Sequence, residues 1–254
     1  MFFIIMKVLF KFLKYGFKYL KIVFLVLRDV FLPKVCLRCD KLSENILCDE
    51  CVKSKSYCKA KRFCRKCGKN GAFEHGFCNE CYGQKRNYRL LRTIVRYNEI
   101  TKDLIHLFKY DQRLDCADYI INDIITNFPY KRISFDYITC VPNHYFSFVK
   151  KGYHHTEYLA HGIEKKLNIP FKYFVKRVGF AYSQTHMSIN KRAKNIENTF
   201  KLTLNENLKD KNILLVEDVI TTGSTINEIC KVLSKTSANI YVLSYADARN
   251  IEEF

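Results

Sequence analysis

The chain has 254 residues, of which 48% are hydrophobic and 15% aromatic, and its formal net charge is +18. This composition excludes a disordered chain, and the length allows one sizeable α/β core with a smaller module beside it. The charge is concentrated at one end, because residues 1–90 hold 20 Lys and Arg residues against 7 Asp and Glu residues. We therefore expect the N-terminal third to attract polyanions, either nucleic acid or an anionic membrane surface.

Residues 1–32 predict a basic amphipathic helix. Five lysines recur at alternating steps of four and three, which places them on one stripe of a helix whose remaining surface is mostly apolar. The longest apolar run is far shorter than the ~20 residues that a membrane span needs, and no secretory cleavage site follows it. We expect the helix to lie on a membrane or to pack against protein, and the pattern does not separate these two surfaces.

Residues 33–90 predict a zinc-binding module. Eight of the 12 cysteines form four CxxC pairs, namely Cys36, Cys39, Cys48, Cys51, Cys64, Cys67, Cys78 and Cys81. Two such pairs close a four-thiolate zinc site without an open position, so we expect the zinc to be structural. Either sequential or interleaved pairing is compatible with the spacing, although the short loops favour sequential sites, and Cys58 and His75 are spare donors.

The setting of these cysteines indicates a compartment and a partner. A Lys-rich chain without an export signal keeps its thiols reduced, so we expect a cytoplasmic protein that has access to the inner face of the membrane. Basic residues surround the CxxC pairs, with Tyr and Phe side chains between them. Since cations contact phosphates and aromatic rings stack on bases, single-stranded DNA is an expected partner, and a solvated basic surface is the alternative.

Residues 91–254 predict a doubly wound, mostly parallel α/β sheet. Short apolar runs at 137–141, 212–217 and 240–245 are typical of strands buried on both faces. Apolar residues at 117–128 and 226–233 follow the period of a helix. Ligands of such sheets bind at the carboxyl ends of the strands, which directs attention to the loops after residues 141 and 217.

The segment ILLVEDVITTGSTINE, residues 213–228, carries the strongest chemical signal. A predicted strand leads to the candidate catalytic pair Glu217 and Asp218, and a turn before the next helix then presents small residues, Thr221, Thr222, Gly223, Ser224 and Thr225. Backbone N–H groups at a helix N-terminus bind phosphate, whereas paired carboxylates suit sugar hydroxyls or Mg2+. The combination predicts a sugar-phosphate site. A plain helix cap is the alternative, but it needs only one hydroxyl.

These motifs resemble the type I phosphoribosyltransferases, and the chain as a whole is similar to the ComF family. The similarity to ComF covers FLPKVCLRC, the cysteine pairs, LIHLFKY at 104–110, VP at 141–142, KKGY at 150–153, and Gln184, Ser188, Arg192, Asn195 and Phe200. The chain departs from the family pattern at Glu217 (usually Asp), Cys140 (usually Pro), Ala181 (often Thr), and His154 and His155 (usually Asn and Gln).

The resemblance implies a site for phosphoribosyl pyrophosphate (PRPP) with Mg2+. Glu217 and Asp218 would contact the ribose hydroxyls and residues 221–225 the 5′-phosphate, with Lys109, Arg192, Val141 and Pro142 on the pyrophosphate side. Among the histidines, His144 is the best functional candidate, because it follows the VP turn.

The resemblance also implies a biological role. We expect an accessory protein of DNA uptake in natural competence that binds PRPP and contacts single-stranded DNA, with the membrane or a DNA-uptake motor protein as a further partner. The alternative is an active phosphoribosyltransferase of nucleobase or nucleotide metabolism, although no residue identifies an acceptor base.

Overall fold

The computed structural model describes residues 34–54, 63–84, 86–142, 154–178, 199–203 and 206–249. The predicted N-terminal helix, Cys58, His144 and Arg192 lie outside these ranges. The chain divides into two compact units, residues 1–54 and 55–254, and the second unit contains the whole of the sheet. The module boundaries predicted at residues 32 and 90 stay a prediction.

The described part of the first unit is a small cysteine-rich fold. Its chain doubles back in a tight turn, in which the Val35 backbone pairs with Leu42, and then enters the short helix α2 (Asp49–Ser54). Asp49 and Glu50 lie in the first turn of α2, where negative charge interacts favourably with the helix dipole. Lys41 forms an exposed ion pair with Glu50 at 2.6 Å.

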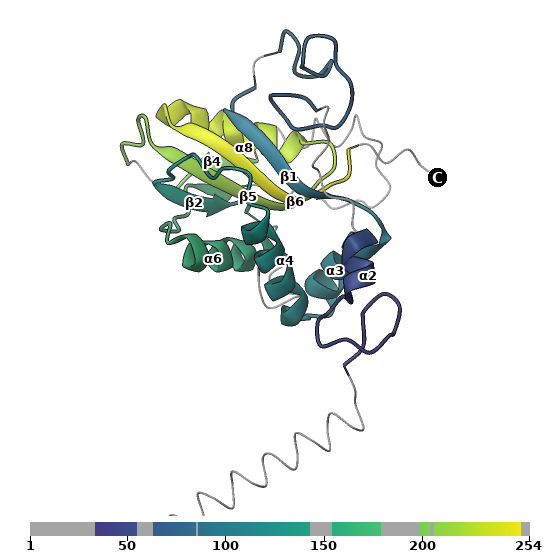
Figure 1. Ribbon diagram of the computed structural model, residues 1–254. Coiled ribbons are helices and arrows are strands. Elements are labelled where there is room, and N and C mark those ends of the chain that lie inside the picture. The colour runs from purple at the N-terminus through teal and green to yellow at the C-terminus, as the bar shows by residue number, and fades with distance from the viewer. Residues whose placement is uncertain are drawn as a thin grey trace, which may run out of the picture. The chain divides into compact units, whose positions relative to one another are not determined.

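The second unit is built on a parallel sheet, which has four strands within the described residues (Figure 1). Their order is β1 (Leu90–Arg96), β6 (Asn239–Asp247), β5 (Asn212–Ile220) and β2 (Tyr137–Cys140). All three neighbouring pairs are parallel. The strands β5 and β6 carry nearly continuous buried residues because helices cover the sheet on both sides.

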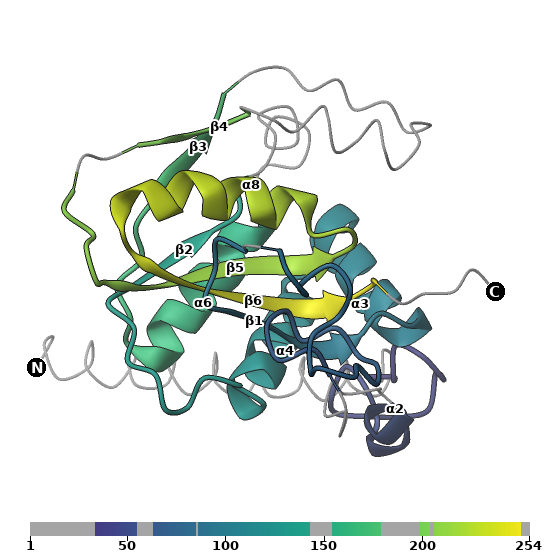
Figure 2. The same ribbon diagram turned by 90° about the horizontal axis from the view of Figure 1, so that it is seen from above.

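Helices lie on both faces of this sheet (Figure 2). One face carries α3 (Glu99–Tyr110), α4 (Leu114–Thr126) and α6 (His155–Leu167). The other carries α8 (Ser224–Leu233), the 3-10 turn η1 (Ser234–Thr236) and the antiparallel pair β3 (Val175–Arg177) and β4 (Phe200–Leu202). The predicted doubly wound parallel sheet is confirmed. None of the helices in the described ranges has the length and apolar character that crossing a membrane requires.

The strands differ from the prediction mainly at their ends. The predicted strand 212–217 continues to Ile220, because β6 is equally long and stays paired with it through Ile220 and Asp247. The acidic pair therefore lies inside the strand rather than after it. The edge strand β1 was not recognised from the sequence.

Candidate functional site

The predicted site residues meet at the carboxyl ends of β2 and β5. The backbone N–H of Val141 donates to the carbonyl oxygen of Val216 at 3.0 Å, which places Val141 and Pro142 beside the strand that carries the acidic pair. Thr156 in α6 donates its hydroxyl hydrogen to the carbonyl oxygen of Val141 at 2.9 Å and holds this strand end in place. The structure thus brings together segments separated by about 75 residues, at the edge where parallel sheets bind ligands.

Asp218 is the centre of this arrangement. Its side chain is 5% exposed, and its Oδ2 atom lies 2.8 Å from Lys109 Nζ and 3.2 Å from His155 Nε2. Lys109 comes from the last turn of α3 and His155 is the first residue of α6, so two helices converge on one carboxylate oxygen. A carboxylate beside the N-terminus of α6 and an ammonium at the end of α3 both suit the helix dipoles.

The electrostatics favour an ionised Asp218. Burial alone would raise the pKa of its carboxyl group, but the charges of Lys109 and His155 outweigh burial and hold that pKa below its ordinary value. Burial likewise opposes the charge of Lys109, and the neighbouring Asp218 more than compensates, so the pKa of Lys109 is raised. The pair is therefore charged over the physiological range of pH.

Glu217 has a different environment. Its carboxyl group interacts with the side chain of Asp218 and with the charge of Lys109. Its Oε1 atom accepts a hydrogen bond from the backbone N–H of Asp218 at 3.0 Å. Burial, followed by the negative charge of Asp218, raises the pKa of Glu217 well above its ordinary value. The two acids thus titrate far apart, and Glu217 is the one that accepts a proton first.

Residues 221–225, which we call the hydroxyl loop, run from the end of β5 into the first turn of α8. Thr221 and Thr222 are exposed, and the Oγ atoms of Thr222 and Ser224 are 2.9 Å apart. The N-cap of α8 is Gly223, with φ of 76°, and no side chain caps the helix there. A Cβ atom added at Gly223 would meet no atom within 4 Å. The backbone N–H of Ser224 donates to Thr222 Oγ1 at 3.3 Å. The helix N-terminus thus has hydroxyl groups beside it and no side chain at Gly223, which suits an anion site.

The structure adds one residue to the predicted set. His155 was given no role from the sequence, whereas its buried ring contacts Asp218 and stands edge-on to the ring of Phe108. The signal in the sequence is its departure from the family pattern, in which glutamine usually stands at this position. Of the predicted residues, Lys109 contacts Asp218 and Val141 pairs with Val216 in β5, whereas Arg192 lies outside the described residues.

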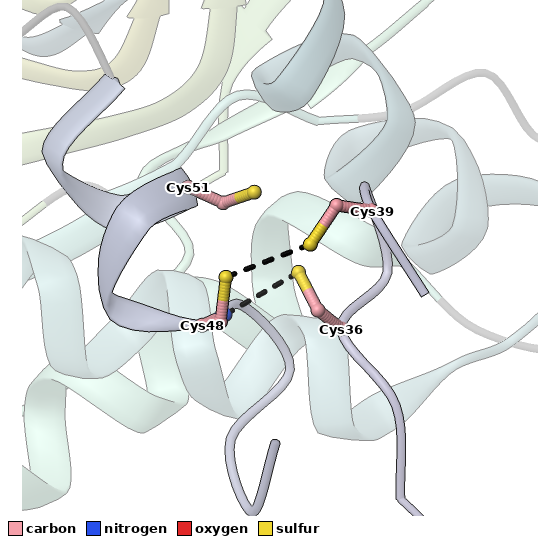
Figure 3. Close-up of side chains that lie close together, drawn as sticks. All are labelled: Cys36, Cys39, Cys48 and Cys51. Atoms are coloured by element: carbon pink, nitrogen blue, oxygen red, sulfur yellow. Dashed lines mark hydrogen bonds between the residues drawn. The ribbon is translucent and has the colours of Figure 1, made fainter. Parts of the chain in front are cut away.

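Cys36, Cys39, Cys48 and Cys51 form the first cluster (Figure 3). Their sulfur atoms all lie within 4.8 Å of one another and point into a common centre. The backbone N–H of Cys48 donates to the sulfur of Cys36 at 3.3 Å. Burial opposes the thiolate of Cys36, but this bond and those from the backbone of Arg38 and Cys39 lower its pKa to about 6. A thiolate held by N–H donors among three other thiols fits a zinc ion.

Cys64, Cys67, Cys78 and Cys81 form the second cluster, whose sulfur atoms meet the same distance criterion and are all buried. The cysteines are thus grouped sequentially, as the loop lengths favoured, and His75 instead stacks on Tyr82 with ring centroids 5.0 Å apart. Burial opposes the thiolate of Cys64, but backbone N–H donors lower its pKa to about 7. The second cluster is part of the buried core that also contains β5 and α8.

Comparison with known proteins shows which class of domain the second unit, which contains the parallel sheet, belongs to. Residues 157–250 match the phosphoribosyl transferase domain. Among solved structures, adenine phosphoribosyltransferase from Thermoanaerobacter pseudethanolicus is 11% identical, with a TM-score of 0.37, over 64% of this chain and 93% of that one. The domain match and the sheet topology make this unit a phosphoribosyltransferase-type domain.

Curated relatives define the family. Competence protein F of Haemophilus influenzae is 31% identical over 212 residues, which cover 79% of this chain and 90% of the relative. The DNA utilization protein YhgH of Escherichia coli K12 is 25% identical and covers 70% of this chain and 80% of its own length. Competence protein ComFC of Streptococcus pneumoniae is 25% identical, covering 80% of this chain and 83% of its own length. The chain belongs to the ComF family.

Proposed function

We propose that the chain binds PRPP with Mg2+ at the carboxyl end of β5 and serves as an accessory protein of DNA uptake. The observation that carries the binding proposal is the buried Asp218, which Lys109 and His155 hold ionised directly before an open hydroxyl loop. The loop supplies donors for the 5′-phosphate, and Asp218 and Glu217 supply acceptors for the ribose hydroxyls or ligands for Mg2+. Lys109 and Pro142 would lie on the pyrophosphate side, as would Arg192.

Both clusters suit structural zinc. Four thiol donors fill a tetrahedral shell, so neither site would offer a position for catalysis, and zinc would instead stabilise the fold. The N–H donors on Cys36 and Cys64 support this proposal, because they favour the thiolate form that binds metal.

The role in DNA uptake is proposed from the names of the relatives and from exposed residues in the segment of the second cluster. The names of the relatives refer to competence and to DNA utilization. In the segment of the second cluster, Tyr82 is 57% exposed, Phe63 40% and Phe77 37%, and Arg65 is also exposed. Exposed rings and cations in one segment suit single-stranded DNA. We place the protein in the cytoplasm, with access to the inner face of the membrane through residues 1–32.

Calorimetric titration of PRPP in the presence of Mg2+ tests the pocket. The unaltered chain should bind, and Asp218→Asn should weaken binding by about 10-fold or more, since a buried charged acceptor is lost. Asp136→Asn is the matched control, because Asp136 lies before β2 at the opposite end of the strands and pairs with Lys211. Absence of heat with the unaltered chain, or equal binding by both variants, would contradict the proposal.

The same titration separates binding from transfer. The family model describes a transferase domain, which favours an active phosphoribosyltransferase as the second candidate function. Addition of purine and pyrimidine bases to the PRPP complex should leave pyrophosphate unreleased if PRPP is a regulatory ligand. Release that depends on one base would instead identify an enzyme and its acceptor.

A further inference from the structure

The second cluster is fastened to the end of β6 by one side chain. Arg249 donates from Nη2 to the carbonyl oxygen of Cys67 at 3.1 Å. Its Nε and Nη2 atoms donate to the two carboxylate oxygens of Asp247 at 2.8 and 2.6 Å. The Arg249 side chain is 7% exposed and that of Asp247 is 5% exposed. Because the planar guanidinium of Arg249 bonds both Asp247 in β6 and the carbonyl group of Cys67, it fixes the backbone of Cys67 relative to β6.

Asp247 is connected to the hydroxyl loop through the pairing of β6 with β5. It is the strand partner of Ile220, and the N–H of Ala248 donates to the carbonyl oxygen of Ile220 at 2.8 Å. Ile220 is the residue immediately before the loop, and Ile226 follows it. Both are buried in the same core cluster as the four cysteines of the second cluster. The two ends of the hydroxyl loop therefore rest on the core to which the second cluster belongs.

The second cluster is also attached to β1. The N–H of Leu91 donates to the carbonyl oxygen of Lys66 at 3.0 Å, and Arg92 donates to the carbonyl oxygen of Arg65 at 2.9 Å. Three consecutive carbonyl groups of the cluster, at residues 65–67, thus accept hydrogen bonds from β1 and from Arg249. A bound metal would fix the four thiols of the second cluster in one geometry. The metal would thereby help to keep the carbonyl group of Cys67, the acceptor of Arg249, in place.

We infer that Arg249 is a positioning residue, through which zinc in the second cluster holds the hydroxyl loop in the conformation that binds PRPP. The inference rests on the proposed PRPP site and adds a regulation to it. Coupling between two binding sites is reciprocal, so PRPP must raise the zinc affinity of the second cluster by the same factor. The first cluster belongs to the other compact unit and is the internal control.

Chelator competition on the full chain measures this coupling. The Cys39→Ser variant impairs the first cluster, so the zinc that a chelator removes from this variant comes from the second cluster. Saturating PRPP with Mg2+ should raise the chelator concentration needed to remove that zinc by about 5-fold or more, a typical allosteric factor. Pyrophosphate with Mg2+ in place of PRPP controls for metal binding by the ligand itself. In the unaltered chain, PRPP should protect one zinc equivalent, that of the second cluster, and leave the other as easily removed as before.

Arg249→Lys tests the residue itself. Lysine keeps the positive charge that pairs with Asp247. It lacks the second nitrogen of the guanidinium group, which lets arginine bond Asp247 and the carbonyl oxygen of Cys67 at the same time. The variant should retain two equivalents of zinc and bind PRPP about 5-fold or more weakly, and PRPP should no longer protect the zinc. Arg113→Lys is the matched control, because Arg113 makes the same two-pronged contact with Asp115 at the surface, with side chains 47% and 49% exposed.

The outcomes separate the two proposals. Failure of the unaltered chain to bind PRPP would overturn the proposed function and this inference with it. PRPP binding that leaves the zinc of the second cluster as easily removed as before would overturn the inference alone. Protection of zinc that survives Arg249→Lys would exclude Arg249 as the connecting residue. The zinc measurement on Cys39→Ser needs no change at Arg249, so it decides the coupling even if Arg249→Lys does not fold.

Discussion

Replacement of Lys109 by methionine is the most direct test of the charges around Asp218. Methionine keeps the length and most of the apolar contacts of the lysine stem but removes the ammonium group 2.8 Å from Asp218. The carboxylate would remain 5% exposed, with His155 as its remaining ion-pair partner among the described residues. The change therefore leaves a buried charge less well compensated without opening a large cavity.

The size of the effect follows from burial. Removing one partner of a buried ion pair costs about 3–5 kcal/mol, and the remaining contact with His155 places this case lower, at about 2–3 kcal/mol. The pair of Lys211 and Asp136 has nearly the same distance, 2.9 Å, but its side chains are 47% and 32% exposed. Lys211→Met should cost only about 0–1 kcal/mol, because water screens that pair. A domain stability of about 5–15 kcal/mol leaves both variants folded.

Urea denaturation of the zinc-loaded full chain, followed by far-ultraviolet circular dichroism, compares the two variants. The pKa of Asp218 is lowered in the folded state, so its contribution is present above the unfolded pKa and is lost as pH falls through the folded one. The cost of Lys109→Met should accordingly shrink on acidification. Equal costs for both variants at neutral pH, or a cost of Lys109→Met that does not change with pH, would refute this account of the site.

Three further predictions concern the pocket. Since the pKa of Glu217 is raised, PRPP binding should weaken as pH falls and Glu217 gains a proton, and calorimetry of Glu217→Gln should give a flatter pH profile. His155→Gln, which introduces the usual family residue, should keep a hydrogen bond to Asp218 and cost about 1 kcal/mol in urea denaturation, against about 2 kcal/mol or more for His155→Leu. Gly223→Ala should lose about 1–2 kcal/mol, because φ is 76°, and bind PRPP more weakly by calorimetry.

Local sequence patterns were sufficient for the layers of the fold. The apolar run of β5 and the spacing of Ile226, Ile229, Cys230 and Leu233 in α8 each report burial within one element, and the structure buries all of them. The strand β1 escaped recognition because LLRTIVR holds Arg92 and Thr93 in its middle. Arg92 is tolerated there since its guanidinium reaches the carbonyl groups of residues 65 and 66. No pattern within seven residues can reveal an acceptor so far away.

The site was predictable only where its residues are consecutive. The acidic pair and the hydroxyl loop are close together in the sequence, so the sequence alone predicts a sugar-phosphate site there. The contacts that tune them are long-range: Lys109 is 109 residues from Asp218, and Arg249 is 182 residues from its acceptor, Cys67. Such contacts depend on where α3 and β6 end and where α6 begins relative to the sheet, which is a property of the assembled topology.

The two clusters allow a final prediction, since they repeat one local geometry in different surroundings. Asp40 and Gly68 each stand four residues after the first cysteine of their cluster, with φ of 55° and 71°. Aspartate tolerates this left-handed conformation at position 40. At position 68 a Cβ atom would lie 2.9 Å from the carbonyl oxygen of Leu91, so only glycine fits against β1. Glycine there is required by the sheet and not by the metal.

The matched changes Asp40→Gly and Gly68→Ala should therefore differ. Asp40→Gly should alter stability by less than about 1 kcal/mol. Gly68→Ala introduces backbone strain and also crowds β1, and together these should lower the free energy of unfolding by about 2–4 kcal/mol. The variant should therefore lower the midpoint of urea denaturation of the second unit. If both variants still bound two equivalents of zinc, the loss could be assigned to the contact with β1. An equal response of the two variants would mean that the second cluster is a separable module, contrary to its place in the core.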